Sequence, residues 1–260
     1  MFAKGRFLQE TTLPKTILIT GASRGIGAAT ALLAAKQGYA VAINYASNSQ
    51  AADEVVRQIR ADGGQAISVQ ADVALEAQVL AMFERVDAEF GRLSALVNNA
   101  GVVDQAARVD EMSLARLQRM FEINVFGSFM CAREAVRRMS TRHGGEGGAI
   151  VNMSSAAARL GAPGTYVDYA AAKGAIDTFT IGLSKEVAGE GIRVNAVRPG
   201  VIDTDIHASG GLPNRASELA PQLPMQRAGT AIEVAESILW LLSEKSGYTT
   251  GALLDVAGGR

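Results

Sequence analysis

The amino-acid sequence predicts an α/β protein with one doubly wound parallel sheet in a single domain. From Thr16 onward, short runs rich in Val and Ile alternate with long Ala-rich helical runs. Strictly alternating strands and helices imply a parallel sheet with helices on both faces, and right-handed crossovers wind it in both directions. The sequence has no Pro/Ser-rich linker, composition break or internal repeat. One domain over residues 16–260 is therefore expected, after a loose N-terminal leader over residues 1–15.

Seven short apolar segments are expected to form the strands, because strands buried on both faces are continuously apolar. In chain order they are Thr16–Thr20, Ala40–Tyr45, Ala66–Gln70, Ala95–Asn98, Ala149–Met153, Arg193–Arg198 and Ala252–Asp255. The longer segments between them have helical patterns: Ile26–Gln37, Gln50–Ala61, Glu76–Phe90, Leu114–Met139, Tyr169–Ala188 and Ile232–Ser243. The two loosest segments are residues 142–148, with four glycines, and residues 204–229, with three prolines. The second is interpreted as a substrate-covering lid, since it lies near the carboxyl ends of late strands, where open α/β sheets bind ligands.

Composition and charge exclude several classes of partner. The 25 Lys and Arg residues nearly balance the 26 Asp and Glu residues, for a net charge of −1, and no basic run is present. Neither nucleic acid nor an anionic membrane is therefore expected as a partner. The N-terminus has no apolar signal region, and no segment is apolar over enough residues to span a bilayer. A soluble, cytoplasmic protein is expected.

Cysteine and histidine give no sign of a disulfide or a metal site. The single cysteine, Cys131, excludes an intrachain disulfide, and its apolar neighbours favour a small buried hydrophobe over a nucleophile. His143 and His207 lack metal-ligand spacing to any Cys or carboxylate cluster. No metal is therefore predicted; His143 is expected to be exposed, and His207 is a candidate substrate contact.

A glycine-rich loop follows the first strand and precedes the first helix. Gly21, Gly25 and Gly27 are spaced G-x-x-x-G-x-G. Glycines allow the backbone to approach a pyrophosphate, while the free N–H groups and dipole of the helix favour the anion. Such a loop alone can be a simple turn, but a strand before it and a helix after it favour dinucleotide binding.

The end of the second strand favours NADP(H) over NAD(H). An acidic residue there bonds the ribose hydroxyls of NAD and repels a 2′-phosphate. Here the strand ends with Asn44 and Tyr45, and no carboxylate follows at that place. Arg24 in the glycine loop supplies a cation that suits phosphate. The alternative is that Arg24 points to solvent and Asn44 tolerates either cofactor.

Tyr169 and Lys173 stand four residues apart in a predicted helix, so they share one face of it. At ~5 Å and an effective dielectric of ~20, a lysine cation would stabilise the phenolate by roughly 3 kcal/mol, or about 2 pKa units. The tyrosine pKa would then move towards neutrality, where a general acid/base works best. The same spacing also occurs by chance on many helices.

Further motifs appear in a fixed order along the chain. After the loop Thr20–Gly27 they are Asn98-Asn99-Ala100-Gly101, Asn124, Ser154-Ser155, Tyr169-x-x-x-Lys173 and Arg198-Pro199-Gly200. Together they resemble the short-chain dehydrogenase/reductase family in its shorter, single-domain form, over Thr16 to Gly259. Within it the chain looks most similar to bacterial 3-oxoacyl-carrier-protein reductases and glucose-dehydrogenase-like members. The resemblance implies a seven-stranded parallel sheet of the Rossmann type.

The resemblance also implies catalytic roles for four residues. Tyr169 would be the general acid or base and Lys173 would hold the nicotinamide ribose, while Ser155 would orient the carbonyl oxygen. Asn124 would position a water that links Lys173 to solvent. The family commonly places the serine thirteen residues before the tyrosine, whereas Ser155 precedes it by fourteen and Ser154 by fifteen. Ser155 is favoured as the nearer, with the extra residue placed in the following loop.

The implied cofactor contacts extend along the same edge of the sheet. They are Gly21, Ser23, Arg24, Gly25, Ile26, Gly27, Asn44, Ser47, Asp72, Val73, Asn99, Ala100, Gly101, Tyr169, Lys173, Pro199, Gly200, Ile202 and Thr204. Asp72 could equally cap the next helix, since Asx residues favour that position. Asn98 and Asn195 are interpreted as structural. Tyr166 and Asp168 are candidates for pocket lining, and Asp203 and Asp205 are interpreted as loop polar groups.

The sequence thus predicts an NADP(H)-dependent oxidoreductase that acts on a small-molecule carbonyl/secondary-alcohol pair. The alternative is a non-catalytic NADP(H)-binding redox sensor; a nucleotide-sugar epimerase is less favoured, because such relatives carry a longer substrate domain. The lid and the loop 102–112 would define the substrate, and neither indicates its chemical class. A homotetramer or dimer is expected through the helices Leu114–Met139 and Tyr169–Ala188, unless these simply cover the sheet.

Overall fold

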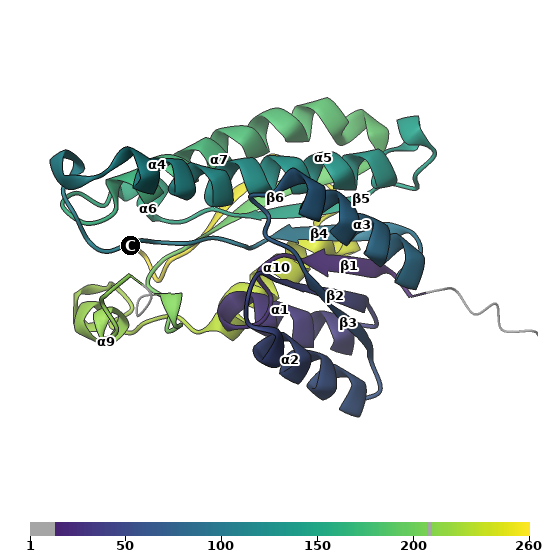
Figure 1. The fold of residues 1–260 in the computed structure, drawn as a ribbon, viewed down its shortest axis with the longest axis horizontal. Helices are drawn as coiled ribbons and strands as arrows, with labels where there is room; N and C mark the ends of the chain where they lie inside the picture. The colour runs from purple at the N-terminus through teal and green to yellow at the C-terminus, as the bar shows by residue number, and fades with distance from the viewer. Residues whose placement is uncertain (1–13, 207–209) are drawn as a thin grey trace, which may run out of the picture.

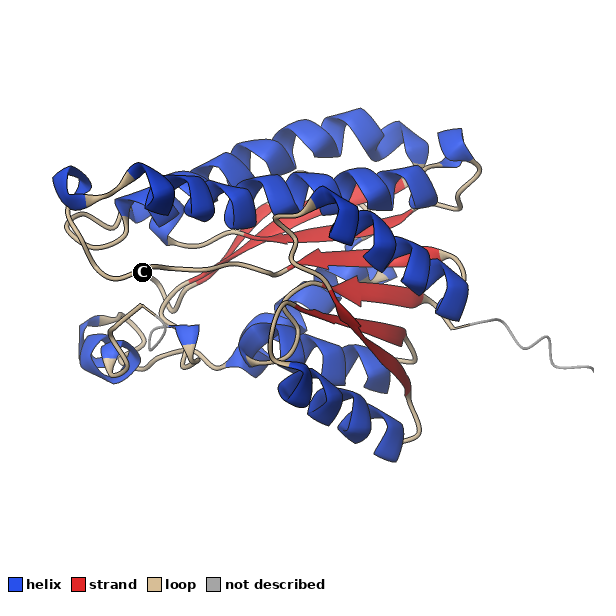
Figure 2. Ribbon diagram, in the orientation of Figure 1, coloured by secondary structure: helices blue, strands red, loops and turns tan. Residues whose placement is uncertain are grey.

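A computed structural model describes residues 14–206 and 210–260, so the expected leader lies almost wholly outside the described residues. Seven parallel strands form one sheet in the order β3-β2-β1-β4-β5-β6-β7 (Figures 1 and 2). The strands are β1 (Thr16–Ile19), β2 (Ala40–Tyr45), β3 (Gln65–Gln70), β4 (Leu93–Asn98), β5 (Gly148–Met153), β6 (Ile192–Pro199) and β7 (Leu253–Val256). The predicted fold class is confirmed, and each predicted strand is present within a few residues.

Helices cover both faces of the sheet, as Figure 1 shows. The α-helices are α1 (Gly25–Lys36), α2 (Ser49–Ala61), α3 (Glu76–Phe90), α4 (Leu114–Phe121), α5 (Gly127–Met139), α6 (Ala157–Leu160), α7 (Val167–Val187), α9 (Arg215–Leu219) and α10 (Ala231–Leu242). Short 3₁₀ turns lie at η1 (Val109–Glu111), η3 (Thr141–His143), η4 (Ala188–Glu190), η5 (Ala220–Gln222) and η6 (Glu244–Ser246). Helices α1, α2 and α10 form one layer, and α3, α5 and α7 form the other.

The core consists of two apolar clusters, one on each face of the sheet. Because side chains alternate along a strand, Ile17 and Ile19 of β1 enter the cluster beneath α1, α2 and α10. Leu18, between them, enters the opposite cluster, with Phe83 of α3. All three β1 side chains are fully buried. This two-sided burial explains why β1 is continuously apolar.

The strand order reverses at β1, which lies between β2 and β4. At such a switch point the loops after neighbouring strands diverge and leave a crevice at the carboxyl edge of the sheet. The glycine loop follows β1, and the Asn99–Gly101 loop follows β4. The topology therefore brings the predicted motifs to one edge.

The single helix predicted over Leu114–Met139 is interrupted. A π-helical turn, η2 (Glu122–Phe126), separates α4 from α5. Inside it the Asn124 side chain is fully buried and donates to the backbone oxygens of Met120 and Val102, each at 3.0 Å. These bonds reach the loop after β4, which helical periodicity could not reveal. Such turns are frequent at functional sites.

The segment over residues 204–229 leaves the sheet after β6 and returns close to its starting point. Gly229 pairs with Ile202 in an isolated parallel bridge, Gly229 N donates to Val201 O at 2.9 Å, and Asp203 N donates to Gly229 O at 2.9 Å. Its described part contains α9 and η5, which the sequence did not predict. Within the described part of the chain, no helix is both long and apolar enough to cross a membrane.

Candidate active site

The glycine loop forms a tight turn between β1 and α1. Gly21 and Gly25 have φ values of +60° and +57°, where a side chain is strained. A Cβ at Gly27 would lie 2.6 Å from Asn99 Nδ2 and 2.7 Å from Gly21 O. Arg24 precedes α1 without a side-chain cap, so no side chain covers the first N–H groups of the helix there. A tight backbone turn with free N–H groups at a helix start is the geometry that suits a pyrophosphate.

Bonds from the loop after β4 hold the glycine loop in place. Asn99 Nδ2 donates to the backbone oxygens of Thr20 and Gly21 at 2.8 and 2.9 Å. The Thr20 hydroxyl accepts from the backbone nitrogens of Asn99 and Ala100 at 3.0 and 2.9 Å. The Asn99 side chain thus holds the glycine loop in its conformation. The Asn99 backbone lies at the carboxyl edge of the sheet.

Asn44 holds the same loop from the other side. Its side chain is 1% exposed, accepts from Gly21 N at 3.1 Å and donates to Ala71 O at 2.9 Å and Val69 O at 3.3 Å. All its polar atoms are therefore engaged inside the protein. Asn44 thereby links β1, β2 and β3, and its contact with a cofactor stays a prediction.

The remaining residues near the expected adenosine end vary in exposure. Arg24 and Ser47 are exposed, and Arg24 forms no ion pair within the described part of the chain. Asp72 does not cap α3, which begins at Glu76 after Leu75; its carboxylate accepts from Ala74 N at 3.0 Å and closes an Asx turn. Val73 is buried against Gly127: a Cβ at Gly127 would lie 2.7 Å from the Val73 side chain.

Ser155, Tyr169 and Lys173 come together where β5 ends against α7. The Lys173 ammonium is 5.5 Å from the centre of the Tyr169 ring and donates to Met153 O at 2.7 Å. The Ser155 side chain lowers the pKa of the Tyr169 phenol, and its hydroxyl accepts from Ala157 N at 3.1 Å. The Ser154 hydroxyl is buried and donates instead to the Lys173 backbone oxygen at 3.2 Å. This geometry favours Ser155 over Ser154 as the serine that acts with Tyr169.

Burial controls the protonation of this group. It raises the pKa of Tyr169 to about 12, against a smaller opposing effect of the Ser155 hydrogen bond. It also lowers the pKa of Lys173 to about 8, with the Asp177 carboxylate acting in the opposite direction. The expectation that Lys173 brings the Tyr169 pKa towards neutrality is therefore wrong for the protein alone. At neutral pH the phenol keeps its proton, which suits a proton donor.

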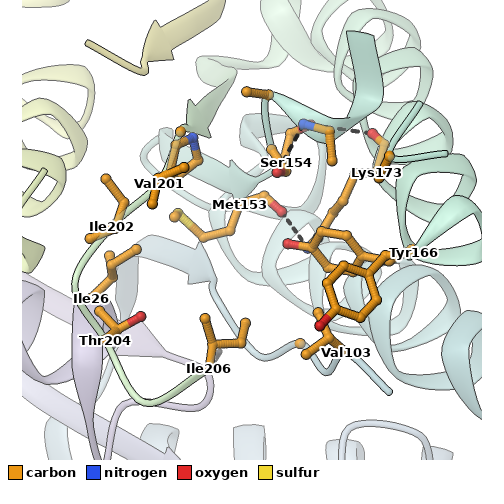
Figure 3. A pocket seen from close by; sticks show the side chains of 18 of the residues that line it. Ile26, Val103, Met153, Ser154, Tyr166, Lys173, Val201, Ile202, Thr204 and Ile206 are labelled. Atoms are coloured by element: carbon orange, nitrogen blue, oxygen red, sulfur yellow. Dashed lines mark hydrogen bonds between the residues drawn. The ribbon is translucent and has the colours of Figure 1, made fainter. Parts of the chain in front are cut away.

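These residues line a single pocket, drawn in Figure 3. Ile202 and Thr204 lie across it from Tyr166 and Lys173. Of the predicted residues, the pocket is lined by Ile26, Asn99, Gly101, Ser155, Tyr169, Lys173, Pro199, Gly200, Ile202 and Thr204. The rest lie outside its lining: Gly21, Ser23, Arg24, Gly25, Gly27, Asn44, Ser47, Asp72, Val73, Ala100 and Asn124.

Asn124 nevertheless lies close to Lys173. A Cβ on Gly101 would lie 2.7 Å from Asn124 Oδ1 and 3.5 Å from Lys173 Nζ, so both polar groups approach the same glycine. Asn124 Oδ1 accepts from Val102 N at 3.2 Å. The side chain of Asn124 therefore fixes the loop over Lys173.

Sequence reasoning missed some lining residues and placed others differently. Tyr166 lines the pocket as expected, whereas the Asp168 carboxylate forms an ion pair with Arg116 instead; Arg215 also lines the pocket, which the sequence does not predict. The available signal for Arg215 was that it is one of two arginines inside the lid segment. His143 is exposed, as predicted, and His207 lies outside the described residues.

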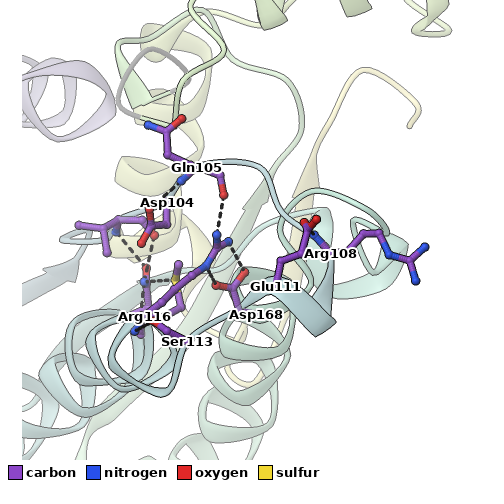
Figure 4. A network of polar contacts seen from close by, with 10 residues as sticks. Asp104, Gln105, Arg108, Glu111, Ser113, Arg116 and Asp168 are labelled. Atoms are coloured by element: carbon purple, nitrogen blue, oxygen red, sulfur yellow. Dashed lines mark hydrogen bonds and ion pairs between the residues drawn. The ribbon is translucent and has the colours of Figure 1, made fainter.

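A buried ion pair anchors the start of α7, next to Tyr169 (Figure 4). Arg116 of α4 donates to both Asp168 carboxylate oxygens, at 2.8 and 3.3 Å, and to Gln105 O at 2.6 Å. The Asp168 side chain is fully buried and that of Arg116 is 10% exposed. Helix α4, the loop after β4 and the start of α7 are thereby joined.

Other titratable groups give no competing site. Burial raises the pKa of the Cys131 thiol to about 12, which confirms it as an inert core residue. Asn98 and Asn195 bond to neighbouring segments, as expected of structural residues. Within the described residues, no cluster of three or more His, Cys, Asp or Glu side chains could hold a metal ion.

The geometry agrees with comparisons to known proteins. A family profile described as enoyl-(acyl carrier protein) reductase matches residues 21–260. The uncharacterised oxidoreductase YgfF of Escherichia coli is 56% identical over 243 residues, 94% of this chain and 98% of that protein. Glucose 1-dehydrogenase 2 of Bacillus subtilis is 37% identical over 245 residues, 94% of either chain. The 3-oxoacyl-[acyl-carrier-protein] reductase FabG of Staphylococcus aureus is 37% identical over 248 residues, 95% of this chain and 98% of that protein.

Solved structures show the same likeness. A short-chain dehydrogenase/reductase variant from Serratia marcescens superposes with a TM-score of 0.87 at 33% identity, covering 94% of this chain and 97% of that one. A short-chain type dehydrogenase/reductase from Mycobacterium marinum gives a TM-score of 0.88 at 34% identity, covering 94% of each chain. The chain therefore belongs to the short-chain dehydrogenase/reductase family of oxidoreductases.

Proposed function

We propose that this protein is an NADP(H)-dependent oxidoreductase that interconverts a small-molecule carbonyl compound and a secondary alcohol, with Tyr169 as general acid/base. The observation that carries the proposal is that Ser155, Tyr169 and Lys173 line one pocket, with the Lys173 ammonium 5.5 Å from the centre of the Tyr169 ring. The pocket lies at the carboxyl edge, where the glycine loop ends β1. The family uses a nicotinamide cofactor. That this protein prefers NADP(H) to NAD(H) is part of the proposal.

Each side chain has a role that follows from its position. The neutral Tyr169 phenol donates its proton to the carbonyl oxygen, and Ser155 orients that oxygen by a hydrogen bond. Lys173 is a cation below about pH 8 and stabilises the phenolate left behind. Asn124, close to Lys173 across Gly101, positions a water that returns the proton from solvent. The nicotinamide group, when bound, supplies the hydride.

The residues at the carboxyl edge of the sheet fit a bound NADP(H). A side chain at Gly21 would clash with Ala100 and one at Gly27 with Asn99, so the tight loop that a pyrophosphate needs depends on glycine at both positions. Arg24 is an exposed cation without an ion-pair partner among the described residues, and Ser47 is exposed after β2. These two residues are proposed to bind the 2′-phosphate. Asp72 and Val73 would flank the adenine, and Pro199, Gly200, Ile202 and Thr204 would border the nicotinamide.

The first test measures NADPH oxidation across a panel of carbonyl compounds, with NADH in parallel. We expect turnover with NADPH, a loss of at least about 10²-fold in kcat for Tyr169→Phe, and unchanged NADPH binding. Arg24→Ala should shift the affinity ratio towards NADH. Tight NADPH binding without turnover of any carbonyl or, with NADP⁺, any alcohol would favour a non-catalytic redox sensor.

Two further proposals concern the segment 204–229 as a substrate lid and the exposed face of α5 and α7 as an interface between subunits. Residues 204–229 would cover bound substrate, since Thr204, Ile206 and Arg215 already line the pocket.

Phe129 of α5 stacks on Phe179 of α7 with ring centres 3.7 Å apart, yet remains 46% exposed. Phe126, at the end of η2, and Ile181 of α7 are also exposed. We propose that this face joins copies of the chain in a homodimer or homotetramer.

A further inference from the structure

The charged residues that line the pocket are all cations. They are Lys173, Arg215 and Arg260, and no Asp or Glu is among the described lining residues. Lys173 is committed to the Met153 backbone oxygen beside Tyr169. The Arg260 backbone oxygen accepts from Arg159 at 2.8 Å, at the exposed end of the chain. Arg215 and Arg260 therefore remain to meet a substrate, and of these two Arg215 is the one that a pocket side chain, Tyr166, holds in place.

Arg215 is held by an aromatic ring. Its guanidinium carbon lies 5.1 Å from the centre of the Tyr166 ring. That ring is itself fixed, because Tyr166 is 6% exposed and its hydroxyl donates to Gly210 O at 3.1 Å. A guanidinium has five N–H donors, so those that do not face the Tyr166 ring or hydroxyl remain for a planar anion.

Arg215 differs from most arginines of this chain. Most of those in the described residues form ion pairs with carboxylates, including Arg227 with Glu233 in the same lid segment and Arg159 with Asp255. Arg215 has no carboxylate within 4.0 Å among the described residues. None of the described residues that line the pocket supplies a side-chain carboxylate to balance its charge.

The remainder of the lining sets the shape of the ligand. Apolar side chains lie in the same pocket as Arg215 and Tyr169, among them Val103, Leu160 and Ile206. A ligand that filled this pocket would present an oxygen to Ser155 and Tyr169 and an apolar body to these side chains. Its anionic group would then meet Arg215.

We infer that the substrate is an oxo acid, whose carboxylate is bound by Arg215 while its carbonyl oxygen is bound by Ser155 and Tyr169. The inference rests on the proposed function and names its substrate class. In the reaction the carbonyl carbon gains the hydride and the oxygen gains the Tyr169 proton. The substrate is thereby reduced to a hydroxy acid, NADPH is oxidised to NADP⁺, and the carboxylate stays unchanged.

Matched acid and ester pairs test the inference. The probes are 5-oxohexanoate and 4-acetylbenzoate against their methyl esters, with NADPH. The wild-type protein should prefer each acid in kcat/KM. Arg215→Met should lower kcat/KM for the acids roughly 10- to 100-fold, the range expected for a charge-assisted hydrogen bond, and leave the esters within about twofold. Arg215→Lys should retain part of the preference, because it keeps the charge without the planar fork.

Arg227→Met is the matched control, since it removes a guanidinium from the same segment outside this pocket. It should leave the acid/ester ratio unchanged. An ester preference in the wild-type protein, or an acid/ester ratio unaffected by Arg215→Met, would overturn the inference. Equal losses in both arginine variants would overturn it too, as a general effect of charge.

Binding separates failure of this inference from failure of the proposed function. If neither acids nor esters are reduced, hexanoate and hexanamide are titrated against the protein–NADPH complex by calorimetry. Tighter hexanoate binding that Arg215→Met abolishes would support the anion site even without turnover. Equal affinities, or no binding of hexanoate, would refute it. Conversely, full turnover in Tyr169→Phe would contradict the proposed function and leave the Arg215 result standing.

Discussion

At the residue scale, Lys173 determines a pH dependence with a definite sign. Burial lowers its pKa from 10.5 to about 8, so between these pH values the unfolded chain binds more protons than the folded one. The contribution of Lys173 to stability is therefore present above about pH 10.5 and is lost as the pH falls through about 8. Tyr169, with its pKa raised to about 12, changes in the opposite sense only above about pH 10.

We expect the free energy of unfolding of the wild-type protein, relative to that of Lys173→Met, to rise between pH 8 and pH 10. Urea denaturation at several pH values measures the difference. A difference that stays flat across this window would show that the Lys173 pKa is not lowered in the folded protein.

The sequence suggests a cofactor contact for Asn44, whereas in the structure its side chain bonds to the protein's own backbone. Replacing it with Asp would remove the Nδ2 donor and place a carboxylate against the backbone oxygens of Ala71 and Val69. We expect Asn44→Asp to lose at least about 2 kcal/mol of stability and to weaken NADPH and NADH alike. Urea denaturation and binding titrations check this; a stable variant with a switched cofactor preference would contradict it.

At the element scale, the Arg116–Asp168 ion pair joins α4 to the start of α7. Removing Arg116 leaves a fully buried carboxylate beside Tyr169, so Arg116→Met should cost about 3–5 kcal/mol of stability. It should also lower kcat more than it raises KM, because the orientation of Tyr169 changes.

The double variant Arg116→Met/Asp168→Asn controls for the buried charge. It should recover part of the stability lost in Arg116→Met, because no unpaired carboxylate remains. Additive losses in a double-mutant cycle would show that the two residues act independently.

The break between α4 and α5 shows what helical periodicity leaves out. The chain over residues 114–139 is helical nearly throughout, as predicted, but the π turn at Glu122–Phe126 depends on Asn124 bonds to the loop after β4. Similarly, α9 is too short to give a periodic signal, and the lid fold rests on the bridge between Ile202 and Gly229. Long elements were predictable because their patterns repeat; short ones were decided by contacts.

At the scale of the whole molecule, the exposed aromatic face of α5 and α7 predicts self-association. We expect light scattering to show a dimer or tetramer at micromolar concentration, and Phe129→Glu to shift it towards smaller species by placing a charge on the face. Ile232→Glu, on α10 in the opposite helix layer, serves as the comparison and should not release monomers. A wild-type monomer would contradict this assembly.

The sequence by itself determined the fold class, the seven strands, the glycine loop, and the grouping of Ser155, Tyr169 and Lys173. Strand and helix periodicities are local, and the topology rules for βα units bring the ends of parallel strands to one edge. The tertiary structure decided the protonation of Tyr169, the engagement of Asn44, the Arg116–Asp168 pair and the place of Arg215 in the pocket. Desolvation and ion pairing depend on which distant segments exclude water from one another, and no short stretch of sequence encodes that.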